Sequence, residues 1–513
     1  MTEMNKGKVY LIGAGPGDPG LLTLKGQDCI RKADVVVYDY LAAPALLAHA
    51  APGADLIYVG KKGGDHTLSQ DGINRLIVEK GLQGLVVARL KGGDPFIYGR
   101  GGEEAEALLE AGVAFEVVPG VTSAVAAPAY AGIPLTHRDY TSTLAFVTGH
   151  EDPTKETSQI NWSSLAAGIG TLVFFMGVKN LPHITARLRE NGMAADTPVA
   201  LVRWGTTNRQ RTVTGTLETI VRVAREAGIK APAIIVVGRV VELRERLRWF
   251  EDRPLLGKNV VVTRARAQAS DLVARLGDLG ANCLEYPTIE VEALEDQTLL
   301  DQAIDNLARY DWIVFTSVNG VRYFFERLFT RGFDVRALHQ MRTAVIGPVT
   351  AERLRDYGLK ADILPESYRA ESVVAAFKDE PMAGRRVLLP RAAEARAVLP
   401  DELARMGAQV DEVIIYRARQ VTAGARQLVD DLRAGRIDLV TFTSSSTVSN
   451  FRALLPDAEA DQLMQGVRVA SIGPVTSETA ASLGIKVDVT ADEYTIPGLC
   501  RAVQTLYAAE SAA

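Results

Sequence analysis

Short apolar runs alternate with amphipathic segments along most of the chain, and this alternation limits the possible fold more than any single motif does. In the first half the apolar runs lie at residues 9–12, 35–38, 56–59, 85–90, 115–118, 144–147, 171–175, 199–202 and 233–237. Strands that alternate with helices predict an α/β architecture with largely parallel sheets. The segment PLTHRDY at 134–140 interrupts the rhythm. We therefore expect two lobes, at about 7–137 and 138–250, with a ligand between them.

The second half of the chain repeats itself. Three segments resemble later segments, and the three separations between partners agree to within one residue. The partners begin at Val260 and Val387, at Val314 and Thr441, and at Val345 and Ser471. Such a repeat predicts two similar α/β lobes. Between the halves, residues 251–257 carry a proline, a glycine and charges, which is typical of a linker.

Charge and cysteine usage exclude several classes of protein. A net charge of -5 argues against a general nucleic-acid binder, because such proteins need a basic excess to neutralise phosphates. The widely spaced Cys29, Cys283 and Cys500 predict neither a metal site nor a disulfide framework. The chain starts without an apolar signal region and lacks an uninterrupted apolar run of about eighteen residues. We therefore expect a cytoplasmic protein with no membrane partner.

The run RLKGGDPFIYGRGGEE at 89–104 has the composition of a ligand loop. It follows an apolar strand and leads into a helix expected from Glu103, with Glu103 and Glu104 as acids in its first turn. A glycine-rich loop between a strand and a helix can cradle a phosphate or a sulfonium cofactor. It can equally be a tight turn with no ligand.

A second glycine motif, GAGPGD at 13–18, follows the first apolar run. It begins like a dinucleotide fingerprint, but Asp18 stands where the third glycine is required, which disfavours a nicotinamide site. The motif also lacks the lysine and hydroxyl residue of a phosphate loop. Pro16 fixes the backbone, which suits a rigid turn that lines a pocket.

Polar residues follow two apolar runs of the first half. Asp39 comes directly after the run at 35–38, and Lys61 follows the run at 56–60. If these strands are neighbours, an acid and a lysine face one cleft, which suits proton transfer, although such acids are as often helix caps. His137 and Arg138 form another polar cluster where the lobes join, and a solvated loop is the alternative interpretation.

The second half offers hydroxyl residues and glycine turns in matched places of its repeat. They are Thr316, Ser317, Ser444, Gly347 and Gly473. Hydroxyls and exposed amides at such turns can hold carboxylates or phosphates, or can simply cap helices. Neither a nucleophile with its base nor a metal-ligand spacing is present. From the residues alone, this half is a two-lobed module that binds small anions.

In order along the first half, the motifs VYLIGAGPGDPGLLTLK, VVVYDYL, RLKGGDPFIYGRGGEE, VVPGVTSA, GIPLTHRDY, VTGH, TLVFFMG and VVGRVV resemble uroporphyrinogen-III C-methyltransferase. The resemblance to this tetrapyrrole methylase family covers residues 7–250. It implies S-adenosyl-L-methionine as the cofactor, and transfer of two methyl groups to uroporphyrinogen III to give precorrin-2. It also implies a homodimer through this half, and a place in porphyrin biosynthesis that leads to siroheme, cobalamin or haem.

The same resemblance assigns roles to individual positions. Asp39 matches the family's proposed base and Lys61 its proposed acid. Positions of the cofactor pocket are matched by Pro16, Gly92, Gly93, Asp94, Ile97, Thr122, Ser123, Met176 and Gly205. The candidates for binding the substrate carboxylates are Arg100, His137 and Arg138. Tyr40 departs from the family, which commonly has arginine there, and Ser123 stands where alanine is common.

The second half resembles uroporphyrinogen-III synthase over residues 258–506, through VVVTRA, VFTSVNGV, two IGPVT turns, EVIIYRAR and TFTSSSTV. The resemblance implies one lobe at 258–292 plus 418–506 and another at 293–417. It implies cyclisation of hydroxymethylbilane with inversion of ring D and loss of water. Tyr416 matches a side chain proposed to assist loss of the hydroxyl, and Ser444 and Thr476 are candidate substrate contacts. The alternative is a module that only binds a tetrapyrrole or another anion.

Overall fold

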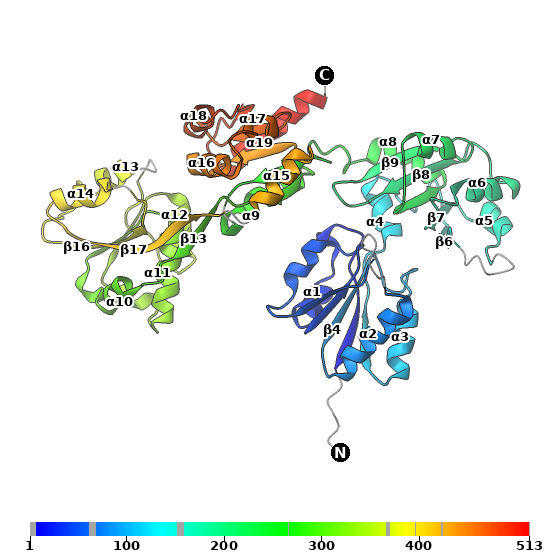
Figure 1. Ribbon diagram of the computed structural model, residues 1–513, viewed down its shortest axis with the longest axis horizontal. Coiled ribbons are helices and arrows are strands. Elements are labelled where there is room, and N and C mark those ends of the chain that lie inside the picture. The colour runs from blue at the N-terminus through cyan, green and yellow to red at the C-terminus, as the bar shows by residue number, and fades with distance from the viewer. Residues whose placement is uncertain are drawn as a thin grey trace, which may run out of the picture. The chain divides into compact units, whose positions relative to one another are not determined.

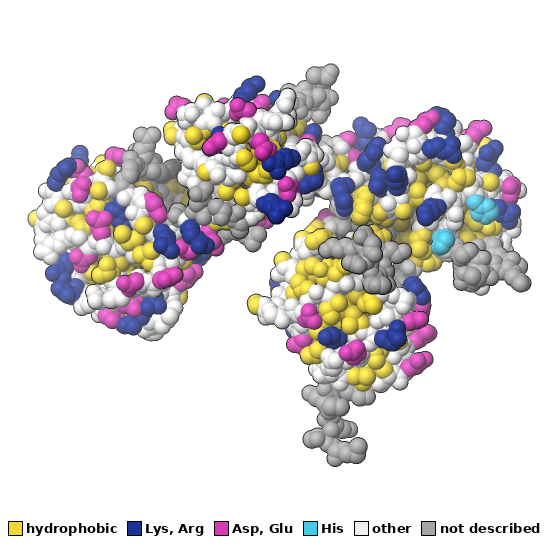
Figure 2. Space-filling model, in the orientation of Figure 1, with side chains coloured by type: hydrophobic (Ala, Val, Ile, Leu, Met, Phe, Trp, Pro, Cys, Tyr) yellow, Lys and Arg dark blue, Asp and Glu magenta, His cyan; other side chains and the backbone are white. Residues whose placement is uncertain are grey.

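The computed structural model describes residues 7–60, 68–150, 159–264, 266–365, 370–395, 397–421 and 424–511. It divides the chain into two compact units (Figure 1). The first unit contains residues 1–258 and 278–282, and the second contains residues 259–277 and 283–513. Basic and acidic side chains are interspersed on the face drawn in Figure 2, in keeping with the small net charge of -5.

The first lobe of the first unit is a parallel sheet with the strand order β3-β2-β4-β1-β5. Its strands are β1 (Lys8–Gly13), β2 (Val35–Tyr38), β3 (Asp55–Tyr58), β4 (Val87–Lys91) and β5 (Ala114–Val118). Helix α1 (Leu24–Arg31) covers one face, and α2 (Gln70–Leu82) and α3 (Gly101–Glu110) cover the other (Figure 1). Short 3-10 helices lie at Pro19–Leu21 and Pro44–His49. Because the strands are parallel, their carboxyl ends share one edge of the sheet.

The second lobe of this unit is a mixed sheet with the order β6-β7-β10-β8-β9. Its strands are β6 (Leu144–Thr148), β7 (Thr171–Phe175), β8 (Pro198–Arg203), β9 (Arg211–Thr216) and β10 (Ala233–Val237). Its helices are α4 (Ser123–Tyr130), α5 (Trp162–Gly168), α6 (Leu181–Glu190), α7 (Ile220–Glu226) and α8 (Arg244–Leu247), with a 3-10 helix at Arg239–Leu243. Strands β6 and β7 are parallel, but β10 is antiparallel to β7 and β8, and β9 is antiparallel to β8. The expectation of largely parallel sheets is therefore wrong for this lobe.

Strand β9 and the loop before it account for part of this difference. The sequence RTVTGT of β9 is mostly polar, and each of its residues is exposed or half-buried at the edge of the sheet. It therefore gives no apolar signal. The loop at 204–210 that joins β8 to β9 is short. A parallel connection needs about a dozen residues or more, so these neighbouring strands have to run in opposite directions.

The second unit contains two sheets. The chain begins the first sheet, forms the whole of the second, and then returns to complete the first. The sheet of the discontinuous lobe has the order β12-β11-β18-β19-β20, and the sheet of the inserted lobe has the order β13-β17-β16-β14-β15. The strands are β11 (Asn259–Val262), β12 (Asn282–Glu285), β13 (Ile289–Ala293), β14 (Trp312–Phe315), β15 (Arg342–Val345), β16 (Arg386–Ala392), β17 (Gln409–Gln420), β18 (Leu439–Phe442), β19 (Arg468–Ser471) and β20 (Val489–Thr490). The chain enters the inserted lobe through β13 and leaves it through β17, and these two strands pair antiparallel (Figure 1).

Helices surround both sheets of the second unit. They are α9 (Arg266–Asp278), α10 (Thr298–Asp305), α11 (Val318–Thr330), α12 (Pro348–Arg355), α13 (Ala370–Ala376), α14 (Val398–Arg405), α15 (Ala425–Arg433), α16 (Ser445–Leu454), α17 (Ala460–Leu463), α18 (Pro474–Ser482) and α19 (Ile496–Ser511), with 3-10 helices at Leu307–Arg309 and Val335–Leu338. Within the described ranges of the chain, no helix combines the length and apolar character needed to cross a membrane.

The internal repeat extends to single hydrogen bonds. In the inserted lobe, the carboxylate of Asp311 accepts a 2.8 Å bond from the backbone N–H of Arg386. In the discontinuous lobe, Asp438 accepts a 2.8 Å bond from the N–H of Asn259 at the matching place. The helices after β14 and β18 also begin alike, with Ser317 and Ser444 as their N-caps. The prediction of two similar α/β lobes in this half is confirmed.

Candidate functional site

Three glycine-containing loops meet at the carboxyl ends of β4, β1 and β5, which are neighbours in the first sheet. The N–H of Gly93 donates a 2.7 Å bond to the carbonyl of Gly15, and the N–H of Gly15 donates a 3.2 Å bond back to Gly93. A Cβ atom at Gly13 would lie 2.4 Å from the Cα of Gly120, and one at Gly120 would lie 2.4 Å from the carbonyl oxygen of Gly93. Side chains would therefore force these loops apart.

Asp94 ties two of these loops together. One carboxylate oxygen accepts a 2.8 Å bond from the N–H of Phe96, and the other accepts a 3.0 Å bond from the N–H of Gly120. Each oxygen retains a further lone pair for a ligand. Thr122 and Ser123 lie beside the same point, since a Cβ at Gly93 would be 3.6 Å from the backbone of both.

Loops of the second lobe complete this region. The N–H of Asp18 donates a 3.0 Å bond to the hydroxyl of Thr206, and a Cβ at Gly205 would lie 2.4 Å from that of Ala127. The hydroxyl of Tyr98 donates a 2.9 Å bond to the carbonyl of Phe146, and its ring packs 4.9 Å from that of Phe175. The structure thus brings the candidate cofactor positions to one region between the lobes: Pro16, Gly92, Gly93, Asp94, Ile97, Thr122, Ser123, Met176 and Gly205.

Backbone strain gathers in this region. Among the described residues, the non-glycine positions with a left-handed backbone are Tyr98, Arg100, Met176, Trp204 and Thr206, with φ between 49° and 70°. Each such conformation costs about 1–3 kcal/mol and is typical of functional sites. Periodicity and composition give no signal for these angles.

Two apolar candidates of the region are open to solvent. Ile97 is 36% exposed and Met176 is 52% exposed. Ile97 belongs to the loop after β4 that contains Gly93, and Met176 follows β7 of the second lobe.

Asp39, the candidate base, lies at the carboxyl end of β2. Its Oδ1 accepts a 3.0 Å bond from the N–H of Leu41, and its Oδ2 lies 3.4 Å from Nη2 of Arg89. The Asp39 side chain is 22% exposed, so it remains accessible to solvent. Leu41 also borders the cofactor region, since a Cβ at Gly92 would lie 2.5 Å from its Cβ. Lys61, the candidate acid, falls outside the described residues.

Two of the candidate substrate residues of this half, Arg100 and Arg138, are exposed, and His137 is half-buried. The guanidinium of Arg100 makes a bidentate pair with Glu103, at 2.8 Å and 2.6 Å, which raises the pKa of Arg100. A substrate carboxylate therefore has to displace Glu103. His137 accepts a 3.2 Å bond from the N–H of Asp139, and Arg138 is exposed. The described contacts do not join His137 or Arg138 to the glycine loops.

Helix α3 differs from the expectation in a way that bears on the site. It begins at Gly101, two residues before Glu103, and follows the left-handed Arg100. Glu104, expected as an acid of the first helical turn, is completely buried. Glu104 pairs with Arg89 and Lys91 of β4. A cluster of charged side chains therefore lies under the helix, at a place where the apolar run at 85–90 predicts a hydrophobic core.

In the second unit, Tyr416 lies on β17 of the inserted lobe. Its hydroxyl is 2.7 Å from that of Ser317, and its ring stacks 5.7 Å from that of Tyr323. Burial raises the pKa of Tyr416, so the phenol stays protonated at neutral pH. Ser317 belongs to a motif that the sequence singled out, but its contact with Tyr416 joins the start of α11 to β17, which are remote in sequence.

Ser444 and Thr476 belong to the discontinuous lobe, after the carboxyl ends of β18 and β19. Ser444 caps α16 in a capping box with Thr447, and Thr476 is buried near the start of α18. Their helices adjoin, because the hydroxyl of Thr479 donates a 2.9 Å bond to that of Ser445. Among the described contacts, none joins Tyr416 to Ser444 or Thr476.

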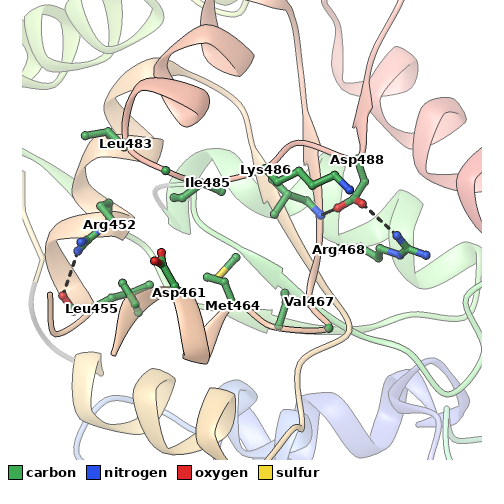
Figure 3. Close-up of a pocket in the computed structure, with 14 residues that line it drawn as sticks. Arg452, Leu455, Asp461, Met464, Val467, Arg468, Leu483, Ile485, Lys486 and Asp488 are labelled. Carbon is green, nitrogen blue, oxygen red and sulfur yellow. Dashed lines mark hydrogen bonds and ion pairs between the residues drawn. The ribbon is translucent and has the colours of Figure 1, made fainter. Parts of the chain in front are cut away.

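A cavity of about 580 Å³ lies at the opposite end of β19 (Figure 3). Its lining includes Arg452, Met464, Arg468, Lys486 and Asp488. Arg468 pairs with Asp488 at 3.0 Å, and Asp488 also accepts a bond from the backbone, so both charges serve the fold. The cavity is separated from Ser444 and Thr476 by the length of the strand.

Comparisons with known proteins identify both halves. The family model of tetrapyrrole (corrin/porphyrin) methylases matches residues 8–221. That of uroporphyrinogen-III synthase HemD matches residues 270–501. The porphyrin biosynthesis protein HemD of Ruminiclostridium josui is 38% identical over 97% of this chain and 97% of its own length.

Two further proteins resemble the first half. An S-adenosyl-L-methionine-dependent uroporphyrinogen III methyltransferase of Methanosarcina barkeri is 54% identical over 47% of this chain and 95% of its own length. A crystal structure of uroporphyrin-III C-methyl transferase from Thermus thermophilus, complexed with S-adenyl homocysteine, is 40% identical over 46% of this chain and all of that chain, with a TM-score of 0.40. From the family models and the full-length relative, the chain belongs to the family of the porphyrin biosynthesis protein HemD, and joins a tetrapyrrole methylase domain to a uroporphyrinogen-III synthase domain.

Proposed function

We propose that the chain catalyses two consecutive reactions of tetrapyrrole biosynthesis. The second unit closes hydroxymethylbilane to uroporphyrinogen III, with inversion of ring D and loss of water. The first unit then transfers two methyl groups to uroporphyrinogen III and gives precorrin-2. The observation that carries this proposal is the match of both family models, in this order, within one chain that aligns along 97% of its length with a porphyrin biosynthesis protein.

S-adenosyl-L-methionine is the cofactor we assign to the first unit, and when bound it supplies an electrophilic methyl group. The residues present fit it. A Cβ at Gly13 or Gly120 would collide with a neighbouring loop, so the backbone of these loops stays uncovered by side chains at this point, where a ligand can bind backbone groups. Asp94 has a lone pair free on each carboxylate oxygen for hydroxyl or amino donors. Ile97 and Met176 offer exposed apolar surface.

Asp39 is the residue we assign to proton removal. When a pyrrole carbon gains a methyl group, the tetrapyrrole must lose a proton, and a carboxylate at the rim of the cleft can accept it. Arg100 at the start of α3, with His137 and Arg138, can bind carboxylates of the substrate. Lys61 stays our candidate for the acid on the basis of sequence alone.

In the second unit the enzyme has mainly to hold its reactive substrate in one conformer and prevent closure without inversion. Tyr416, whose pKa is raised by burial, keeps the proton with which it can donate a hydrogen bond to the departing hydroxyl group. Ser444 and Thr476 are the residues we assign to the substrate in the discontinuous lobe.

The test uses the whole protein in two steps. Hydroxymethylbilane alone should give uroporphyrinogen III, which is separated chromatographically from the uninverted isomer after oxidation. Addition of S-adenosyl-L-methionine should convert it to a product heavier by two methyl groups. Accumulation of only the uninverted isomer would instead support an anion-binding second unit.

An Asp39→Asn variant sharpens the assignment of the first unit. It should bind S-adenosylhomocysteine as the wild type does, in calorimetry, but transfer methyl groups about 100-fold more slowly. Full turnover of this variant would remove Asp39 from the mechanism.

We further propose a cytoplasmic homodimer formed through the first unit. Light scattering of the purified protein tests the dimer, and fractionation of the source cells tests the location.

A further inference from the structure

Two cations and an acid lie in the core of the first lobe, beneath α2 and α3. Arg89 and Lys91 sit two residues apart on β4, so their side chains point to the same face of the sheet. They are 3% and 4% exposed, and Glu104 of α3 is fully buried. Such residues are almost never this buried unless they are paired.

The pairs converge on one oxygen of Glu104. Its Oε1 accepts bonds from Lys91 at 2.6 Å, from Gln70 at 3.2 Å and from Arg89 at 3.3 Å. Its Oε2 is buried and has no hydrogen-bond partner among the described residues. Desolvation and the charge of Arg89 lower the pKa of Lys91. An unpaired buried oxygen costs about 1–3 kcal/mol, so this cluster is not the arrangement that stability alone favours.

The guanidinium of Arg89 is fixed at each of its nitrogens. Nε donates to Glu104 at 3.3 Å, Nη1 donates to the carbonyl of Leu90 at 2.7 Å, and Nη2 donates to Oδ2 of Asp39 at 3.4 Å. Arg89 thus links the buried acid to a carboxylate that is 22% exposed at the carboxyl end of β2. The N–H of Leu41 holds the other oxygen of Asp39.

We propose that Arg89 is a positioning residue for Asp39, and that Glu104 holds Arg89 in place. With one donor on each oxygen, the carboxylate of Asp39 is confined to one orientation at the rim of the cleft. A planar guanidinium with its other nitrogens anchored is well suited to this, because it loses little further freedom. This inference rests on the proposed function, in which Asp39 accepts the proton released during methyl transfer.

The surroundings of the cluster support a role beyond folding. The same face of the sheet is otherwise apolar, with Val9, Leu11, Val35 and Val37 in its core. Well-packed apolar residues can replace a buried ion pair with no loss of stability. The charges are instead placed at the end of the strand nearest the glycine loops and Asp39.

The test is a double-mutant cycle in the full-length protein. Arg89→Gln should lower the kcat of methyl transfer to uroporphyrinogen III about 10- to 100-fold, because a misplaced catalytic group costs that much. The Kd for S-adenosylhomocysteine should stay within about twofold of wild type, since the cofactor cradle is made by other residues. In an Asp39→Asn background, Arg89→Gln should have almost no further effect, because the residue through which Arg89 acts is already disabled.

Controls separate positioning from folding. Lys8→Gln removes a cation of the same lobe that pairs with Glu116 at the surface, and it should leave both kcat and cofactor affinity unchanged. If Arg89→Gln does not bind S-adenosylhomocysteine, Arg89→Lys takes its place in the cycle. Arg89→Lys keeps the buried charge but loses the planar fork, and should retain an intermediate kcat.

The outcomes distinguish the two hypotheses. If kcat losses of the single variants multiply in the double variant, Arg89 does not act through Asp39 and the positioning role is wrong. If the wild-type protein binds S-adenosylhomocysteine but forms no methylated tetrapyrrole, the proposed function fails and the positioning role fails with it.

Discussion

The hydroxyl of Tyr416 lies 2.7 Å from the hydroxyl of Ser317, although the two residues belong to a strand and a helix far apart in sequence. Ser317 in turn caps α11 by accepting a 2.9 Å bond from the N–H of Gly320. The phenol is therefore held by a group that is itself fixed at a helix start.

Tyr416→Phe should slow formation of uroporphyrinogen III about 100-fold, since it removes the proposed donor but keeps the ring. Tyr323→Phe is the matched control, because this ring stacks on Tyr416 while its own hydroxyl bonds to the carbonyl of Val291. Rates are measured with hydroxymethylbilane by separating the porphyrin isomers. If the wild type and Tyr416→Phe form uroporphyrinogen III at equal rates, the Tyr416 hydroxyl takes no part in the reaction and the ring only packs in the core.

Two substitutions at Ser444 separate capping from substrate binding. Ser444→Ala removes the cap of α16 and should lower the free energy of unfolding by about 1 kcal/mol. Ser444→Asn keeps a side chain that caps helices, so its stability should be close to wild type. If Ser444 binds the substrate, both variants should raise the KM of the synthase reaction. If only the destabilised variant Ser444→Ala raises the KM, Ser444 serves to cap α16 and does not bind the substrate.

Gly120→Ala should weaken cofactor binding strongly. The new Cβ would lie 2.4 Å from the carbonyl oxygen of Gly93 and 2.6 Å from the Cα of Gly13, so the loops must move. A strain of about 1–3 kcal/mol corresponds to a Kd for S-adenosylhomocysteine raised about 5- to 150-fold in calorimetry.

Gly102→Ala is the matched control for Gly120→Ala. A Cβ at Gly102, in the first turn of α3, meets no atom within 4 Å. This variant should bind the cofactor normally and unfold with a free energy larger by about 0.4–1 kcal/mol. Weaker binding by both variants would contradict a specific role of the close approach at Gly120.

Alkaline pH should destabilise the protein through tyrosines that donate to aspartates. Burial and a nearby carboxylate raise the pKa of Tyr130, Tyr286 and Tyr310 far above the ordinary value. Each binds its proton more tightly in the folded chain, so its contribution to stability is complete below the unfolded pKa of about 10 and is lost as pH rises above it. Urea unfolding at pH 8 and at about pH 10.5 measures this loss.

Substitution of one tyrosine tests the cause of that pH dependence. Tyr310→Phe removes the group that donates a 2.7 Å bond to Asp411, so stability should fall less steeply with alkaline pH than in the wild type. Tyr494→Phe, at a side chain that is 65% exposed, should keep the wild-type slope. If the free energy of unfolding falls equally steeply with pH in the wild type and both variants, groups other than Tyr310 cause the loss of stability at alkaline pH.

The strands that the sequence predicts best are those whose residues are apolar throughout. Strand β2 begins and ends where the apolar run at 35–38 does, because Val35, Val36 and Val37 are buried, so both faces of the strand are apolar. Strand β4 instead starts at Val87 and continues to Lys91, beyond the expected end. Glu104 neutralises its charges from a helix outside the strand, and no local pattern reports such a partner.

The sequence motifs locate the candidate site, but not the contacts that shape it. The glycines of 13–17 and 89–104 mark loops in which one backbone segment approaches another closely. Because such approaches need glycine, the composition of these segments is enough to single them out as candidate site loops. The link from Asp39 through Arg89 to Glu104 joins β2, β4 and α3, and depends on the order of strands in the sheet. Left-handed angles at Met176 and Thr206 are likewise set by tertiary packing.

The antiparallel pair β13 and β17, through which the chain enters and leaves the inserted lobe, sets an order of assembly on the ribosome. All strands of the inserted lobe have been synthesised once Gln420 is added, whereas the discontinuous lobe then has only β11 and β12. The last strand of the discontinuous lobe ends at Thr490, which is synthesised on the order of ten seconds later at about 5–20 residues per second. Until β18 is synthesised, the edge of β11 lacks the strand with which it pairs, and an unpaired edge can pair with a wrong strand.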